Sequence, residues 1–319
     1  MDYFRIKTAD ELSKLHDIAF SSTSKATKTT FYQSMKRMER LYEVPMPEIK
    51  LRFIDEKDDF LKMLDESKYS ENTKLTTLTN ILKLLKIIDA PLITYNSWLE
   101  TLKTKTEARQ KKDKAVLKSK LKVLMEFKDI RNEVNESSDK YMSETMDYDD
   151  FENFLILALF TLQIPVRVSN YVNLKVVDDE TFTNEKDNFL IVDGEQYKFI
   201  FNKYRTSHIL GKKEIYVHDQ NLQFLIDKWL SEYNTDSNNF LTISEDNKRP
   251  MNGRQIQDAL EQSTIKLFGS KLSIDNIRSS YMKMIVDLDP EFSQKLDIAN
   301  ILGYSSTDQL ETLEDLTSS

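Results

Sequence analysis

The sequence predicts a mainly α-helical protein with a small antiparallel β-sheet in its second half. The first observation is the placement of the glycines: the 319-residue chain has five, and none precedes Gly194. The second is hydrophobic periodicity, which is helical over long stretches of the first half and gives way to short strand-like segments after residue 187. The length allows two domains of ordinary size, each with its own core.

Helices are expected in residues 1–108, which we predict to be one compact helical domain. Two segments have apolar residues spaced to line one helical face. They are Phe31, Met35, Met38 and Leu41 in the first segment, and Leu75, Leu78, Leu82 and Leu85 in the second. The pattern S-x-x-T-K-x-T precedes both, at Ser24 and Ser70, and indicates either capped helix starts or an internal duplication. A further helix is expected from about Pro91.

A basic segment follows, and residues 109–145 are predicted to be a helical linker. The stretch 103–131 has eleven basic residues against four acidic ones, although the whole chain carries a net charge of −8. The negative total argues mildly against a simple nucleic-acid binder. The uneven distribution favours a face that meets a polyanion, for which Lys111, Lys112 and Lys118 are candidates, and a solvated helix is the alternative.

The second predicted domain, residues 146–319, begins with an apolar helix whose first turn is acidic. Its carboxylates are expected to suit the positive end of the helix dipole rather than to bind a metal. They are Asp147, Asp149, Asp150 and Glu152. A second helix is expected at 164–174, with Pro165 in its first turn.

The predicted sheet has three strands. Two strands within 188–201 are joined by Asp193-Gly194, a dipeptide that suits a two-residue hairpin turn, and a third strand at 214–219 follows a basic loop. Four helices are expected after it, at 221–233, 252–268, 273–287 and 290–302. Gly303 is the expected left-handed cap of the last of these, and a further helix should begin at Ser305, with Asp308 three positions on.

Several classes of protein are excluded or disfavoured. The chain has no cysteine, which excludes disulfides and thiolate metal sites, and we expect a reducing, intracellular compartment. No metal or cofactor is expected, because His16, His208 and His218 lack a ligand spacing and the phosphate-loop, G-x-S-x-G and dinucleotide motifs are missing. No secretory signal or membrane role is expected, since no apolar run approaches the roughly 20 residues that span a bilayer.

Two arginine-containing segments flank the predicted sheet. They are IPVRVSNYVNL, with Arg167, and SIDNIRSSYMK, with Arg278; a helix that ends in Leu-Gly follows. In this order, with a basic loop between the last two strands, the segments resemble the catalytic domain of tyrosine recombinases, the phage-integrase family. The resemblance covers about residues 146–319, and the helical first half is similar to that family's core-binding, SAM-like domain. It implies that the two domains clamp double-stranded DNA.

The resemblance also implies roles for individual residues. In that family two arginines hold the non-bridging oxygens of the scissile phosphate, a lysine protonates the leaving 5′ oxygen, and a tyrosine forms a 3′-phosphotyrosine without a metal. Arg167, Arg278 and Lys203 match the first three roles. Further contacts to phosphate are expected from the same basic turn, at Arg205, His208, Lys212 and Lys213, and Arg205 competes with Lys203 for the contact. Taken singly, each residue also fits a snorkelling arginine or a solvated loop charge.

The departures from the family pattern affect the predicted activity. Asp275 stands where a histidine is usual, and Tyr304 stands where histidine or tryptophan is usual. Leu313 occupies the position of the nucleophilic tyrosine, and no tyrosine follows Tyr304. Leucine has no nucleophilic atom, so the sequence predicts a recombinase relative that has lost cleavage.

Three functions stay open at this point. The first is a DNA-binding protein with a recombinase fold and no cleavage, in other words a pseudoenzyme. The second is an active recombinase or integrase that uses Tyr304 or a tyrosine supplied in trans. The third is a protein-interaction scaffold. A homo-oligomer formed through the C-terminal segment is a further expectation from the family, and the glycine-poor composition, rich in Asn and Lys, suggests a virus or mobile element.

Overall fold

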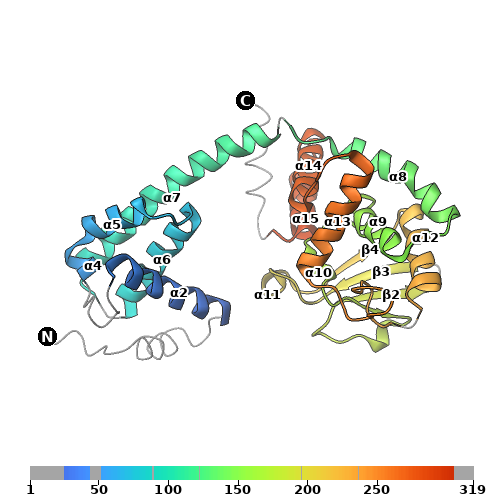
Figure 1. The fold of residues 1–319 in the computed structure, drawn as a ribbon, viewed down its shortest axis with the longest axis horizontal. Coiled ribbons are helices and arrows are strands. Elements are labelled where there is room, and N and C mark those ends of the chain that lie inside the picture. The colour runs from blue at the N-terminus through green and yellow to red at the C-terminus, as the bar shows by residue number, and fades with distance from the viewer. Residues whose placement is uncertain are drawn as a thin grey trace. The chain divides into compact units, whose positions relative to one another are not determined.

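A computed structural model describes residues 25–43, 52–87, 90–121, 123–194, 196–235 and 237–304. The chain divides into two compact units, Met1–Val116 and Leu117–Ser319. The boundary therefore falls inside the segment expected as a linker. Figure 1 shows the first unit in blue to green and the second in green to red. None of the helices described is both long and apolar enough to cross a membrane.

The first unit is helical in its described part, and its apolar side chains form one core. Its helices are α2 (Lys25–Tyr42), α4 (Arg52–Asp55), α5 (Lys57–Glu66), α6 (Glu71–Ile87) and α7 (Leu92–Leu121), of which α7 continues past the boundary. The predicted helical faces are buried as expected, apart from Leu41 and Leu75, which are half-buried. Trp98 of α7 lies in this core, and the centre of its ring is 6.0 Å from the ring centre of Phe53 and 5.9 Å from that of Phe60.

The second unit is built around α9 (Tyr148–Thr161), in which every side chain from Phe154 to Thr161 is buried. A helix that is apolar on all sides belongs in an interior. The helices packed against α9 include α8 (Phe127–Ser143), α12 (Gln220–Lys228), α13 (Gly253–Phe268) and α14 (Ile274–Asp287). The shorter elements are α10 (Val168–Tyr171), η1 (Glu180–Phe182), α11 (Ser207–Leu210), η2 (Trp229–Tyr233) and α15 (Phe292–Leu302).

The fold class is confirmed, because the chain is mainly helical and has one small sheet. The sheet has the order β1-β2-β3-β4, and its strands are β1 (Lys175–Val177), β2 (Phe189–Asp193), β3 (Gln196–Phe201) and β4 (Lys213–Tyr216). The expected strands pair antiparallel, β2 with β3 and β3 with β4. In Figure 1 the strands labelled β2 to β4 lie side by side below α9.

The sheet differs from the prediction in one respect: it is mixed rather than purely antiparallel. The additional strand β1 runs parallel to β2, with Val176 opposite Leu190. Its outer edge is partly covered, because the Val176 backbone N–H donates to the Asn238 carbonyl at 2.8 Å. Strand β1 has only three residues and is held by backbone hydrogen bonds on both sides. A segment this short has too little side-chain periodicity to be recognised as a strand from the sequence.

Two expectations near the start of the second unit need correction. Pro165 does not lie in a helical first turn, because α10 starts only at Val168 and Arg167 before it is extended, with φ −75° and ψ 150°. The acidic cluster is only partly a cap. Asp147 precedes α9 without a side-chain capping bond, whereas the Glu152 carboxylate is buried and accepts a 2.9 Å hydrogen bond from the Thr242 backbone N–H. Burial raises the pKa of Glu152 to about 8.

The C-terminal helices agree with the prediction as far as the structure describes them. Helices α14 and α15 follow one another, and Gly303 ends α15 in the left-handed region with φ +85°. The expected helix start at Ser305 and Asp308 and the family's nucleophile position at Leu313 lie outside the described residues. The predicted oligomer contact through this segment stays a prediction.

Candidate phosphate-binding site

The second unit brings three cationic side chains from three separate elements to the C-terminal end of α15. Arg167 precedes α10, Lys213 begins β4, and Arg278 lies in the second turn of α14. Tyr304, directly after the cap of α15, completes the group. We call Arg167, Lys213 and Arg278 the cation cluster.

Arg278 is the buried centre of the cation cluster, with 3% of its surface exposed. Its guanidinium donates hydrogen bonds to the carbonyl of Pro165 and, at 2.8 Å, to the carbonyl of Leu302. A third bond joins it to the Tyr304 hydroxyl at 3.2 Å. Arg278 therefore ties the segment before Arg167 to the end of α15, and no carboxylate neutralises it among the described residues.

Arg167 stands beside Arg278 and is half-buried. Its guanidinium carbon lies 5.2 Å from the centre of the Tyr304 ring, and the Arg278 guanidinium carbon lies 5.5 Å from the same centre. The Nε of Arg167 is buried and has no hydrogen-bond partner. Burial lowers the pKa of Arg167, and repulsion from Arg278 lowers it further. An unsatisfied buried donor on a charged group costs free energy unless a ligand accepts from it.

Lys213 has no carboxylate partner in the described part of the chain. Its Nζ donates to the Ile301 carbonyl at 3.2 Å and lies 4.1 Å from the centre of the Tyr204 ring. Burial lowers the pKa of the Lys213 ammonium to about 8, with smaller contributions from Arg278 and Arg167. At neutral pH the site therefore concentrates positive charge in a partly desolvated place.

Gly303 explains why these side chains can approach the end of α15 so closely. A Cβ at this position would lie 3.4 Å from the Arg167 Nε and 3.8 Å from the Lys213 Nζ. Its positive φ also favours glycine on conformational grounds. The Gly303 carbonyl accepts a 3.2 Å hydrogen bond from the Thr206 hydroxyl, which attaches the loop before β4 to the same corner.

The two arginines of the cation cluster line a pocket of about 390 Å³, and Lys213 lies outside its lining. Arg167, Arg278 and Arg205 line it together with Asp275, and its remaining lining residues are Val168, Ser169, Gln257, Ser273 and Ile274. Asp275 and Arg205 are exposed at this pocket. An anion with several oxygens fits the arrangement, because guanidinium groups bind phosphate oxygens through fixed pairs of N–H donors.

Lys203, which the family resemblance matched to the proton donor, lies in a neighbouring pocket and not in the cation cluster. That pocket, of about 350 Å³, is lined by Lys203, Arg205, Ser169, Val172, Asn173, Asp187, Asn188 and Tyr204. The buried Asn188 side chain fixes the Lys203 backbone by accepting from its N–H at 2.7 Å and donating to its carbonyl at 3.0 Å. The lysine that the fold places beside the two arginines is Lys213.

A signal for this placement exists in the sequence. In the stretch from Lys213 to Val217 the apolar residues Ile215 and Val217 alternate with polar ones, so period-two alternation places Lys213 on their face, toward the interior. The exposed and half-buried positions of β4 alternate accordingly. The match of Lys203 to the family's lysine depends on its place in the loop and makes no use of this alternation.

The remaining predicted contacts are at the surface. His208 is exposed, and Lys212 is exposed and forms ion pairs with Glu180 at 2.9 Å and Glu214 at 2.6 Å. In the first unit Lys111 and Lys112 are exposed on α7. Lys118 belongs to the same helix, but its side chain lies outside the described part of the structure.

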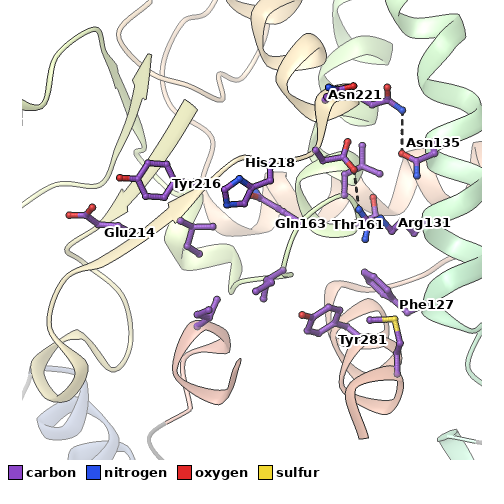
Figure 2. A pocket seen from close by; sticks show the side chains of 17 residues that line it. Phe127, Arg131, Asn135, Thr161, Gln163, Glu214, Tyr216, His218, Asn221 and Tyr281 are labelled. Carbon is purple, nitrogen blue, oxygen red and sulfur yellow. Dashed lines mark hydrogen bonds and ion pairs between the residues drawn. The ribbon is translucent and has the colours of Figure 1, made fainter. Parts of the chain in front are cut away.

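The second unit also has a larger hollow, of about 1000 Å³, on the side of β4 and α14 shown in Figure 2. Its one arginine is neutralised, because Arg131 pairs with Asp219 at 3.0 Å. Phe127 and Tyr281 form part of the wall, with ring centres 5.0 Å apart. The hollow lacks the unpaired cations of the cation cluster and is therefore a poorer place for a phosphate.

Comparison with known proteins shows a resemblance to solved structures only. No protein-family model matches the chain, and no curated protein matches it. A solved structure described as "Crystal structure of XerA recombinase" is similar over 95% of this chain and 92% of that chain, with 11% sequence identity and a TM-score of 0.39. At this level of similarity the functional argument rests on the geometry of the site.

Proposed function

We propose that this protein binds double-stranded DNA through the backbone phosphates, as a cleavage-deficient relative of the tyrosine recombinases. The observation that carries the proposal is the cation cluster itself. Three positive side chains from different elements converge without an ion pair among the described residues, and one of their N–H donors is buried without a partner.

The physical argument for a phosphate ligand is that its negative charge would compensate the partly buried positive charges of the cation cluster. Arg167 and Lys213 are half-buried, and burial is the main reason that the pKa of each is lowered; repulsion from Arg278 lowers both further. A phosphodiester would relieve this repulsion and accept from the unpaired Nε of Arg167. Because the two arginines remain protonated at any physiological pH, the site holds its charge ready for an anion.

The argument for DNA combines the site with the sequence. The two arginine segments resemble those of tyrosine recombinases, whose ligand is the DNA backbone. Exposed lysines on α7, Lys111 and Lys112, offer a second basic surface to the same polyanion. Phosphate contacts of this kind position a protein on duplex DNA and carry no sequence information.

The proposed lack of cleavage follows from the residues at the reactive positions of the family pattern. Leu313 has no nucleophilic atom, and an ionised Asp275 would repel the phosphate rather than donate to it. Asp275 is exposed at the same pocket as the two arginines. Binding without cleavage is the function that these side chains support best.

A second candidate function has one observation in its favour. The Tyr304 hydroxyl lies 3.2 Å from an Arg278 nitrogen, and its ring faces both guanidinium groups. A tyrosine in this place could attack a bound phosphodiester. A covalent protein–DNA adduct that resists SDS, persists in Leu313→Ala and disappears in Tyr304→Phe would establish cleavage by Tyr304.

The binding proposal is tested by duplex affinity, measured by fluorescence anisotropy at several salt concentrations. Each neutralised phosphate should add about 0.9 to the slope of log K against log salt concentration. We expect a slope of several units for the natural chain and a slope smaller by about one in Arg167→Ala and in Arg278→Ala. The matched control is Arg131→Ala, which removes an arginine that is already paired with Asp219.

Two outcomes would contradict the proposal. Absence of binding even at low salt would favour the protein-interaction scaffold. An equal loss of affinity in Arg131→Ala and Arg167→Ala would show that the total charge matters and that the cation cluster does not.

A further inference from the structure

The pocket at the cation cluster and the neighbouring pocket at Lys203 have one wall in common. Ser169, at the start of α10, and Arg205, in the loop before β4, line both. Arg205 also lies close enough to Arg167 to lower its pKa. The two pockets are therefore adjacent, and an extended ligand can pass from one to the other along Arg205.

The neighbouring pocket has its own unpaired cations. Lys203 and Arg205 are exposed, and neither forms an ion pair or a side-chain hydrogen bond within the residues that the structure describes. The one acidic residue on the pocket wall, Asp187, pairs with Lys175 at 2.7 Å and accepts a further bond from Asn184 at 3.1 Å. The hydrogen bond from Lys175 is the main cause of the lowered pKa of Asp187, and attraction to the nearby Lys203 contributes to it. The charge left for a ligand in this pocket is positive.

The position of Lys203 relative to the cation cluster is fixed by a buried side chain. The Asn188 amide donates to the carbonyl of Asn170 at 2.9 Å and to that of Lys203 at 3.0 Å, while its oxygen accepts from the Lys203 N–H. Asn170 lies in α10, three residues after Arg167. One asparagine with 4% exposure therefore ties the backbone at Lys203 to the backbone of α10.

We propose that the Lys203 pocket is a second phosphate subsite, which binds the phosphate next to the one at the cation cluster on the same DNA strand. Lys203 and Arg205 are its cationic ligands. This inference rests on the proposed function, and it gives Lys203 a binding role separate from the proton donation expected from its place in the loop.

The structure favours neighbouring phosphates over two independent anions. Successive phosphates of a strand are joined by one nucleoside, and the two pockets have Ser169 and Arg205 as common lining residues. Two further polar residues of the subsite, Asn173 and Ser169, can bond to sugar or phosphate oxygens. A strand that follows this wall places one charge in each pocket.

The test measures duplex affinity against salt for Lys203→Gln and for Arg205→Gln. We expect each variant to lower the salt slope by about one and to weaken binding equally on unrelated sequences. Lys140→Gln is the charge-matched control, because Lys140 is exposed on α8 and lines neither pocket. Arg167→Ala, measured alongside, reports on the cation cluster.

A second duplex tests whether the two phosphates are neighbours. In this probe every other phosphate of both strands is replaced by an uncharged methylphosphonate, so two adjacent charges never occur. We expect the effect of Lys203→Gln to vanish on it. If the effect persists there, Lys203 contacts a phosphate elsewhere and the inference is wrong.

The failure of this inference can be told apart from failure of the proposed function. If the natural chain does not bind DNA at low salt, the proposed function fails, and the subsite fails with it. If the natural chain binds, Arg167→Ala lowers the slope and both Lys203→Gln and Arg205→Gln leave it unchanged, only the second subsite is overturned.

Discussion

Lys212 and Lys213 are neighbours in the sequence, yet they belong to two regions with opposite electrostatics. Lys212 is exposed and is part of a paired network formed by Glu180, Lys198, Lys212 and Glu214. Hydrogen bonds that the Lys212 ammonium donates to Glu214 and Glu180 raise its pKa. Lys213, one residue on, is half-buried in the cation cluster, and burial lowers its pKa to about 8.

The comparison distinguishes a lysine whose charge is already paired with carboxylates, Lys212, from a lysine whose charge remains available to a ligand, Lys213. In the paired network each lysine has carboxylate partners at the surface, where such pairs contribute little to stability. In the cation cluster no carboxylate forms an ion pair among the described residues, and the charges lie against backbone carbonyls, aromatic rings and the Tyr304 hydroxyl. Their partial burial therefore costs free energy of folding. A group of charges that is partly buried at a cost in folding free energy indicates a binding site.

We expect the largest effect from a substitution of Gly303, the glycine next to the cation cluster. Gly303→Ala should lower the free energy of unfolding by about 1–2 kcal/mol, because alanine is disfavoured at φ +85°. It should also weaken DNA binding, since the new methyl group would cover the Arg167 Nε at 3.4 Å. Urea unfolding and fluorescence anisotropy measure the two effects.

Gly269→Ala is the matched control for this prediction. Gly269 has nearly the same conformation, with φ +65°, but an added Cβ there would meet nothing within 4 Å. We expect a similar loss of stability and unchanged DNA affinity. If both variants bind DNA as the natural chain does, the face of Arg167 next to Gly303 does not contact phosphate.

The next substitution, at Lys213, is expected to make the protein more stable. Lys213→Met should raise the free energy of unfolding at pH 7 by about 1 kcal/mol, because it removes a partly desolvated charge; the remaining exposure of the ammonium and the lost bond to Ile301 limit the gain. The native chain binds fewer protons than the unfolded chain between about pH 8 and 10.5, so its stability rises with pH over that window. The variant should lack this rise.

Thermal or urea unfolding of Lys213→Met at pH 7 and pH 10 provides the measurement, with DNA affinity beside it. The variant should be more stable at neutral pH and bind DNA more weakly, which is the exchange expected of a functional residue. A variant that is less stable than the natural chain at pH 7 would show that the Ile301 and Tyr204 contacts outweigh the burial of the charge.

Much of the fold could be predicted because its signals are local. The helical faces of α2 and α6 follow from the spacing of apolar side chains, and Asp193-Gly194 marks the turn between β2 and β3. Gly303 ends α15 where a left-handed cap was expected. Strand β1 escaped prediction because its pairing with β2 depends on backbone bonds across the chain and not on a pattern within its three residues.

The candidate site could be predicted only in part, because its geometry is tertiary. Arg167 and Arg278 stand in recognisable segments, and the structure brings them together. The choice between Lys203 and Lys213 depends on where β4 begins, since a shift of one residue reverses the face of every side chain in a strand. The role of Asn188 could not be read from the sequence, because its partners Asn170 and Lys203 lie 18 and 15 residues away.

The smallest expected effect belongs to the paired network. Lys212→Met should change the free energy of unfolding by no more than about 0.5 kcal/mol, because exposed ion pairs contribute little and Lys198 still neutralises Glu180 and Glu214. Its salt slope for DNA should equal that of the natural chain, since a lysine held by two carboxylates has little charge left for a phosphate. A slope lower by about one, as large as for Lys213→Met, would mean that Lys212 leaves its carboxylates for the DNA backbone. In that case the distinction between satisfied and available charge would not hold along β4, and DNA contact would extend across both faces of the strand.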